Sequence, residues 1–238
     1  MTWLRDGLIS KSKSQIVMIQ SEAGLGKSRL IREFSSQLAH EGFSIHLGQC
    51  EAEFVNRTYK VFDQIIYSIF KSEYGMTPAA VLKLSSALPE PILDLAELID
   101  SRLENKENVS VSTNDFEKIV FEAFKIISEH NLIIIDDWHW VDNASRQIIE
   151  TLLKADLDHI KIILATRQRD AVFEEMNNIA VLELKPLGND EIEELVSSLL
   201  PGYDPFVLEQ MIDYSGGCLL YTSPSPRDAT LSRMPSSA

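Results

Sequence analysis

Residues 15–28 read QIVMIQSEAGLGKS, and this stretch decides the fold. Residues 15–20 are a mostly aliphatic run, which is typical of a strand buried on both faces. A glycine loop follows directly and ends in Lys27 and Ser28. Apolar side chains then recur at helical spacing from Leu30 onward. A buried strand, a glycine loop ending in Gly-Lys-Ser and a helix, in this order, form the P-loop pattern of phosphate-binding proteins.

The chemistry of phosphate binding explains why these residue types stand in this order. Successive backbone N–H groups from Ala23 to Ser28 can form an anion-binding nest where the helix starts. Lys27 can reach the β- and γ-phosphates, and the Ser28 hydroxyl can join the shell of a Mg²⁺ ion. The predicted phosphate-binding residues are Glu22, Ala23, Gly24, Leu25, Gly26, Lys27 and Ser28. Ser21 departs from the pattern, because it stands where the first glycine is expected and its Cβ makes the turn harder to form. An ordinary serine-rich turn is the alternative, which the flanking strand and helix disfavour.

A second motif follows a second buried strand. Residues 132–135 are four aliphatic side chains, and Asp136 and Asp137 come directly after them. Ligands of open α/β sheets bind at the carboxyl ends of the strands. We therefore predict that Asp136 holds Mg²⁺ and that Asp137 orients or deprotonates an attacking water. A strand that simply ends in a polar turn is the alternative, which the presence of the P-loop disfavours.

A third strand, over residues 160–165, is followed by Thr166 and Arg167. An arginine at that end of a sheet can sense a γ-phosphate and stabilise charge in the transition state. A surface arginine at a strand end is the alternative reading of Arg167.

The order of elements predicts an α/β fold. Strands are expected at residues 15–20, 44–49, 131–136, 160–166 and 179–184. Helices are expected at residues 28–40, 60–73, 114–129, 144–155 and 189–200. This alternation is typical of a parallel sheet, here of five strands, with helices on both faces. Residues 75–112 interrupt it, and we interpret them as a helical insertion with short helices at 78–87 and 91–104.

Three regions are expected along the chain. Residues 1–185 form the core, and residues 186–217 begin a truncated helical lid whose second helix starts at Asp204 and Pro205. Residues 218–238 change abruptly to a Ser- and Pro-rich composition. Back-translation of this last segment matches the adapter used in transposase-based DNA library preparation. We therefore expect it to be translated adapter, which is not native sequence.

Composition restricts the function further. The net charge is −14, from 22 Lys and Arg against 36 Asp and Glu, which disfavours a nucleic-acid-binding surface. The sequence has no run of about 18 apolar residues, so no membrane span is predicted. Residues 1–15 lack the apolar core of a signal peptide. The two cysteines, Cys50 and Cys218, predict no disulfide framework and fit a cytoplasmic protein.

Four segments together resemble a known family: SEAGLGKSRLIREF, LIIIDDWHWVDNAS, IILATR and LELKPLGNDEIEELV. They are similar to the AAA-related ATPase module of STAND signalling proteins, which occurs in LuxR-type transcriptional regulators and beside adenylate cyclase and kinase domains. The resemblance covers about residues 15–217. It implies that Asp136 is the Walker B acid, Asp137 the catalytic acid and Arg167 the first sensor. The DDWHWVD string also contains His139, Trp140 and Asp142, whose roles stay open between catalysis and packing.

The resemblance also implies that the chain is a fragment. The family usually carries an Arg-Glu segment before the first helix, and this chain begins just after it. An Asn-Pro pair that lies against the adenine is usual where Cys218 and Leu219 stand here.

The predicted function is ATP binding and Mg²⁺-dependent ATP hydrolysis, as the nucleotide switch of a larger signalling or transcription-regulatory protein. The expected ligands are ATP or ADP and Mg²⁺, and the expected partners are effector or sensor domains in the rest of that protein. We expect no direct nucleic-acid binding and no membrane contact, whereas nucleotide-dependent self-association is compatible with the switch. Two alternatives stay open. The first is a nucleotide-binding module with little turnover. The second is a P-loop kinase whose small-molecule substrate is covered by residues 75–112.

Overall fold

The computed structural model describes residues 4, 8, 16–54, 57–83, 88–103, 113–125, 127, 130–155, 157, 159–168, 179–199 and 202. The chain forms two compact units. The first contains residues 1–20 and 32–182, and the second contains residues 21–31 and 183–238. The predicted second lid helix, from Asp204, and the predicted adapter segment, residues 218–238, lie outside the described residues.

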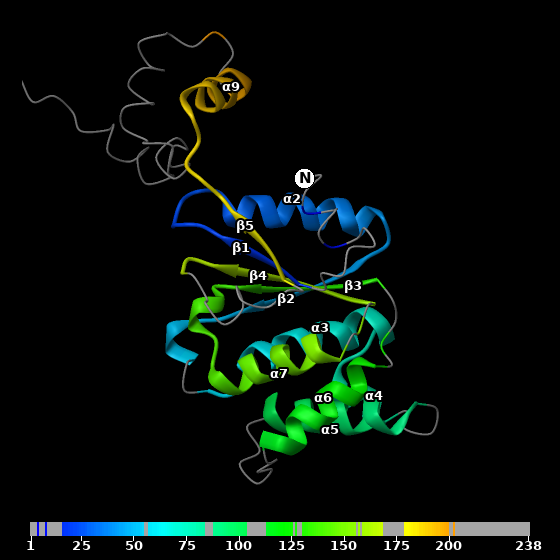
Figure 1. Cartoon of the computed structure of the whole chain (residues 1–238). Coiled ribbons are helices and arrows are strands. Elements are labelled where there is room, and N and C mark those ends of the chain that lie inside the picture. The colour runs from blue at the N-terminus through cyan, green and yellow to red at the C-terminus, as the bar shows by residue number, and fades with distance from the viewer. Residues whose placement is uncertain are drawn as a thin grey trace, which may run out of the picture. The chain divides into compact units, whose positions relative to one another are not determined.

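A five-stranded sheet is the centre of the first unit (Figure 1). Its strands are β1 (Ile16–Gln20), β2 (Ser44–Gln49), β3 (Asn131–Asp136), β4 (Ile160–Thr166) and β5 (Ile179–Glu183). They lie in the order β2-β3-β4-β1-β5. β3 pairs in parallel with both β2 and β4, and β4 pairs in parallel with β1. The predicted α/β fold is confirmed, and every described strand boundary lies within one residue of its prediction.

Three of the strands, β1, β3 and β4, form where aliphatic residues run without alternation. All of β1 is buried, and so are the first five residues of β3. This pattern is expected for parallel strands that are covered by helices on both faces. Figure 1 shows α2 (Lys27–His40) on one face of the sheet, and α3 (Lys60–Tyr74) and α7 (Asn143–Lys154) on the other.

The helical insertion adds a further layer against α3 and α7. It contains α4 (Pro78–Leu82) and α5 (Glu90–Leu103), and both contact α3; α6 (Thr113–Phe124) follows and contacts α5 and α7. Apolar side chains of α5 and α6 belong to the same buried core as α3 and the sheet. The insertion is therefore packed into the core of the first unit.

Two helices, α4 and α6, end five residues earlier than predicted. α4 ends at Leu82 because the N–H of Lys83 donates to the carbonyls of both Ala80 and Val81, which tightens the last turn. The prediction for α4 extended to residue 87, and residues 84–87 lie outside the described part of the chain. α6 ends at Phe124 where residue 129 was predicted.

The second unit contains the glycine loop, the first turn of α2 and α9 (Asn189–Leu199). α9 starts where the Glu191 carboxylate accepts the N–H of Gly188 at 2.8 Å. Asp190 and Glu191 lie in the first turn of the helix, where negative charge complements the helix dipole. In the part of the chain that the structure describes, no helix is long and apolar enough to cross a membrane.

Candidate functional site

The glycine loop of the second unit closes on its own lysine. Gly24 and Gly26 have φ of 84° and 85°, a left-handed conformation that glycine adopts without steric cost. Lys27 is buried at the first position of α2. Its ammonium donates to the carbonyl and to the hydroxyl of Ser21, each at 3.0 Å. The residue that replaces the usual first glycine is therefore a hydrogen-bond acceptor for the lysine of the motif.

The exposure of the other loop residues suits an approaching ligand. Glu22, Ala23 and Ser28 are exposed, and the residues from Gly24 to Gly26 are partly exposed. The N–H groups at the start of a helix attract anions, and a lysine ammonium adds positive charge there. The loop fits a phosphate group on these grounds.

In the first unit, Asp136 ends β3 and begins a segment that we name the acid loop, residues 136–142. The N–H of Cys50 donates to the carbonyl of Asp136 at 3.0 Å. The N–H of Asp137 donates to the Asp136 carboxylate at 2.8 Å. Asp137 has φ 52°, in the left-handed region that Asp tolerates better than most residues. This turn leads the chain from β3 into the short helix η2 (Trp138–Trp140).

The carboxylate of Asp137 lies close to two nitrogen-bearing side chains. Its Oδ1 is 3.6 Å from Nε of Arg167 and 3.9 Å from Nδ1 of His139. Arg167 lies in a turn that follows β4. In this turn the Thr166 hydroxyl donates to the carbonyl of Gln168 and accepts the N–H of the same residue. The Arg167 side chain is 52% exposed, so the ion pair contributes about 0–1 kcal/mol. The ion pair matters for the site because of where it puts the two residues. Arg167 and Asp137 were predicted separately, and the fold brings their side chains within 3.6 Å.

Asp142 ends the acid loop and is buried. It is the N-cap of α7, where its Oδ1 accepts the N–H of Ser145 at 2.9 Å. Its Oδ2 accepts the Ser145 hydroxyl at 2.6 Å and the N–H of Tyr59 at 3.2 Å. Tyr59 has φ 65°, which costs a non-glycine residue about 1–3 kcal/mol and persists only where the surroundings hold it. Asp142 therefore has a structural role that the DDWHWVD string left open.

The role of Tyr59 could not be predicted from the sequence, whereas the N-cap role of Asp142 could. Asp142 and Ser145 have the spacing of an N-cap and the third residue of a helix. Nothing in the local sequence indicates a left-handed tyrosine, because its conformation depends on a carboxylate 83 residues away.

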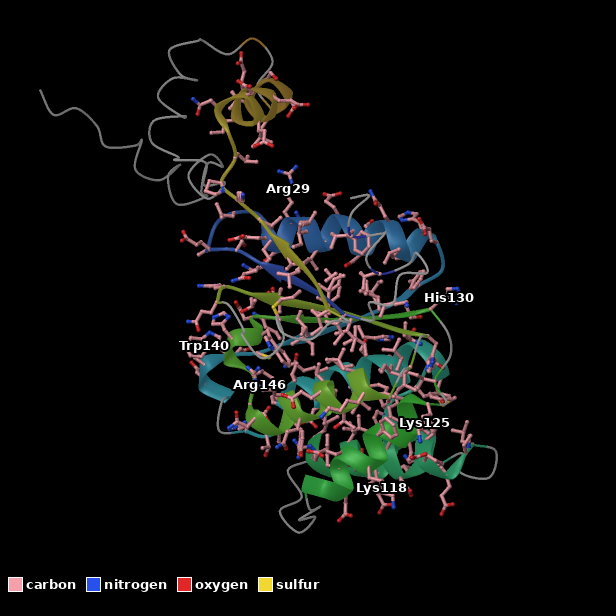
Figure 2. All side chains as sticks on the ribbon, in the orientation of Figure 1. Arg29, Lys118, Lys125, His130, Trp140 and Arg146 are labelled. Atoms are coloured by element: carbon pink, nitrogen blue, oxygen red, sulfur yellow. The ribbon has the colours of Figure 1, made fainter. Side chains whose placement is uncertain are left out.

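Trp138 and Trp140 differ in their surroundings. Trp138 is fully buried, and the guanidinium of Arg146 lies 5.3 Å from its ring centre. Trp140 is 44% exposed. Figure 2 shows Trp140, the last residue of η2, and Arg146 on α7, the helix that follows. Trp138 is therefore a packing residue of the core.

A shallow pocket with a cavity volume of about 10 Å³ lies against the acid loop. Its lining residues are Gln49, Cys50, Glu51, Arg57, Lys60, Val61, Trp140, Val141 and Asp142. Small-molecule pockets usually measure about 300–1,000 Å³, so this one is too small to be assigned to a nucleotide. Burial and, secondly, the charges of Asp142, Asp137 and Asp136 raise the pKa of Cys50 to about 12. The thiol therefore stays protonated at neutral pH.

The donor set suits a magnesium ion that is shared with a ligand. Magnesium usually takes one or two carboxylates, with phosphate and water completing its shell. Asp136, at the carboxyl end of β3, has the chemistry for this role. Among the residues that the structure describes, no group of three or more His, Cys, Asp and Glu side chains is placed to hold a metal ion.

A parallel α/β sheet, a glycine-lysine loop after one strand and paired acids after another define a P-loop nucleotide-binding module. Residues 6–163, more than half of the chain, match the AAA ATPase domain family. The chain belongs to this family. It therefore carries a nucleotide-binding ATPase module of the AAA type.

Similar proteins include one curated relative and several solved structures. An uncharacterized protein of Rhizobium meliloti (strain 1021) is 24% identical over 237 residues, which covers 92% of this chain and 23% of the relative. A STAND protein with a tetratricopeptide-repeat sensor from Pyrococcus horikoshii is 16% identical, with a TM-score of 0.49 and coverage of 93% and 30%. The Orc1 protein of Aeropyrum pernix, in complex with DNA, is 13% identical, with a TM-score of 0.48 and coverage of 90% and 52%. The chain spans less than a quarter of the curated relative.

Proposed function

We propose that the chain binds ATP and hydrolyses it with the help of Mg²⁺, as the nucleotide switch of a larger signalling or transcription-regulatory protein. The observation that carries this proposal is the pair of motifs in an AAA ATPase family member. A glycine loop closes on Lys27 after β1, and Asp136 and Asp137 follow β3.

The topology of the sheet supports the role proposed for the acids. β1 and β3 both pair in parallel with β4, so all three strands end at the same edge of the sheet. Ligands of open α/β sheets bind at this edge, and Asp136 and Asp137 stand there at the end of β3.

Each predicted residue has a distinct task in this proposal. The backbone of residues 22–28 and the Lys27 ammonium bind the phosphates. The Ser28 hydroxyl and Asp136 are the proposed ligands of Mg²⁺, which would supply positive charge to neutralise the phosphates. Asp137 orients the attacking water and takes up its proton.

In this mechanism Arg167 can pair with two negatively charged groups, the Asp137 carboxylate and the γ-phosphate. It lies 3.6 Å from the Asp137 carboxylate, and a γ-phosphate offers a second negative group. When the Arg167 side chain turns from Asp137 to the γ-phosphate, its guanidinium stabilises the negative charge that develops there in the transition state. The carboxylate of Asp137 then loses a cationic neighbour at the moment when it acts as a base.

The switch acts through segments beyond the core. We propose that residues 186–217 begin a helical lid and that ATP holds this lid closed, with release after hydrolysis. Effector or sensor domains in the rest of the protein read this change. We propose a cytoplasmic location, no direct nucleic-acid contact and nucleotide-dependent self-association for this module.

Phosphate release from ATP under single-turnover conditions tests the proposal. We expect Mg²⁺-dependent release from the parent chain and none from Lys27→Ala. Arg29→Ala is the matched control, because Arg29 is an exposed cation two residues further along α2 (Figure 2). Binding without phosphate release would favour a module with little turnover. Transfer of the phosphate to an added small-molecule acceptor would favour a kinase. Unchanged ATP affinity in Lys27→Ala would refute the P-loop assignment.

A further inference from the structure

The turn that precedes α3 is held from two sides. On one side, the N–H of Tyr59 donates to Oδ2 of Asp142, at the end of the acid loop. On the other side, the ring of Tyr59 stacks on Phe116 of α6, with ring centres 3.9 Å apart and planes 9° apart. One residue in a left-handed conformation, Tyr59, therefore joins the acid loop to α6, the helix that follows the insertion.

Arg102 of α5 adds further contacts to the turn before α3 and to the stacked rings of Tyr59 and Phe116. Its Nε and Nη2 donate to the two carboxylate oxygens of Asp63 at 2.6 and 3.0 Å, and Nη2 also donates to the carbonyl of Thr58 at 2.6 Å. The guanidinium lies 5.8 Å from the ring centre of Tyr59 and 5.1 Å from that of Phe116. A bidentate arginine that also stacks on aromatic rings has a single well-defined position. The backbone of residues 58–63 is thus fastened to α5.

The acid loop between Asp136 and Asp142 is short and internally bonded. The N–H of Trp140 donates to the carbonyl of Asp137 at 2.9 Å, and the N–H of Val141 donates to that of Trp138 at 3.0 Å. Trp138 fills the core beneath the loop. These two backbone hydrogen bonds fix the shape of the turn between Asp137 and Asp142.

We propose that Asp142 is a positioning residue for ATP hydrolysis: it ties the acid loop to Tyr59, so that α5 and α6 determine where Asp136 and Asp137 stand. This inference rests on the proposed function. It gives α5 of the insertion and α6, the helix that follows, a role in catalysis: they hold Asp136 and Asp137 in position. A misplacement of about 1 Å at a catalytic group can cost about 100-fold in rate, which is why such a support matters.

A helix cap alone is the competing explanation for Asp142. Ser is as good an N-cap as Asp, so Asp142→Ser keeps the bond to the N–H of Ser145. The single, shorter oxygen of serine cannot also reach the N–H of Tyr59. This variant therefore separates the cap from the link. Ser145→Ala is the matched control, because it removes a hydrogen bond to the same carboxylate and leaves both the cap and the link to Tyr59 in place.

The experiment measures single-turnover hydrolysis and Mg-ATP affinity for the parent, Asp142→Ser, Arg102→Lys, the double variant and Ser145→Ala. Lysine keeps a charge near Asp63 and loses the bidentate geometry of arginine. We expect Asp142→Ser to lower kcat by about 10- to 100-fold, which is the typical cost of removing a hydrogen bond that supports a functional group from behind. Affinity should stay within about twofold, since the P-loop is untouched. The double variant should be no slower than Asp142→Ser, because both changes break one connection.

A second measurement keeps the test decisive if a variant is unstable or the parent proves inactive. The backbone amide signals of Asp137 and Trp138 in ¹H–¹⁵N spectra should shift in Asp142→Ser and in Arg102→Lys, and stay in place in Ser145→Ala. Parental kcat in Asp142→Ser, additive losses in the double variant, or unshifted amides would each overturn the inference. An inactive parent chain would refute the proposed function instead, and the amide signals would still decide whether the link exists.

Discussion

Gly48 of β2 is the position where the structure makes the sharpest stability prediction. A Cβ built at Gly48 would lie 2.6 Å from Cγ2 of Val61, and 2.9 and 3.0 Å from Cδ1 and Cγ1 of Ile65. Val61 cannot turn away easily, because a β-branched side chain in a helix has one strongly preferred rotamer. Both neighbours are buried on α3, so a shift of either one disturbs the core.

The expected magnitude for Gly48→Ala follows from two opposing effects. Overpacking a core costs about 1–3 kcal/mol. Replacing glycine lowers the entropy of the unfolded chain, which stabilises by about 0.4–1 kcal/mol. The clash is the larger effect, so we expect a net loss of about 1–2 kcal/mol. In a protein of this size this corresponds to a fall in melting temperature of about 2–8 °C.

Urea unfolding of the parent and of four variants measures this loss. Leu47→Ala is the control on the same strand, because Leu47 is 56% exposed and its truncation should change the free energy of unfolding by less than about 0.5 kcal/mol. Val61→Ala removes buried atoms and is itself destabilising, but it should cost less in Gly48→Ala than in the parent, since it removes the atom nearest to the new Cβ. Equal or greater stability of Gly48→Ala would refute the reasoning about the clash.

Three further predictions concern the site and a buried histidine. Lys27→Ala should abolish Mg-ATP binding measured by calorimetry, because the ammonium is the side-chain cation of the glycine loop; retained affinity would contradict its role. Asp137→Asn should keep Mg-ATP affinity and lose phosphate release, because the amide keeps the shape and cannot take up a proton; parental turnover would show that the two acids are assigned wrongly. Burial lowers the pKa of His46, while its hydrogen bond to Asn131 and the charge of Glu73 act in the opposite direction. The folded state therefore favours the neutral imidazole, so the contribution of His46 to stability is present above about pH 6.5 and is lost as the pH falls below it. The urea midpoint should accordingly drop between pH 7.5 and 5.5, and this drop should be smaller in His46→Gln; equal drops would exclude His46 as the cause.

The sequence alone was sufficient to place the strands of the sheet, but it did not predict their order. β1, β3 and β4 are runs of aliphatic residues, and such runs encode burial on both faces without any knowledge of the partners. Helix boundaries were harder to predict. The last turn of α4, for example, depends on a bifurcated backbone hydrogen bond, which the residue types in the sequence do not indicate. The roles of the candidate site residues stay predictions, although the fold does bring Arg167 and Asp137 within 3.6 Å.

By itself, the sequence determined that a glycine loop with Lys27 follows one buried strand and that Asp136 and Asp137 follow another. These are local patterns, and local patterns specify backbone conformation over a few residues. Only the tertiary structure decided that Asp142 holds the N–H of Tyr59 and that Arg102 fastens the same turn through Asp63. These partners are 83 and 39 residues apart in the chain. Contacts between such distant residues form only when the packing of the core sets the distance between helices, so no pattern of neighbours in the sequence could announce them.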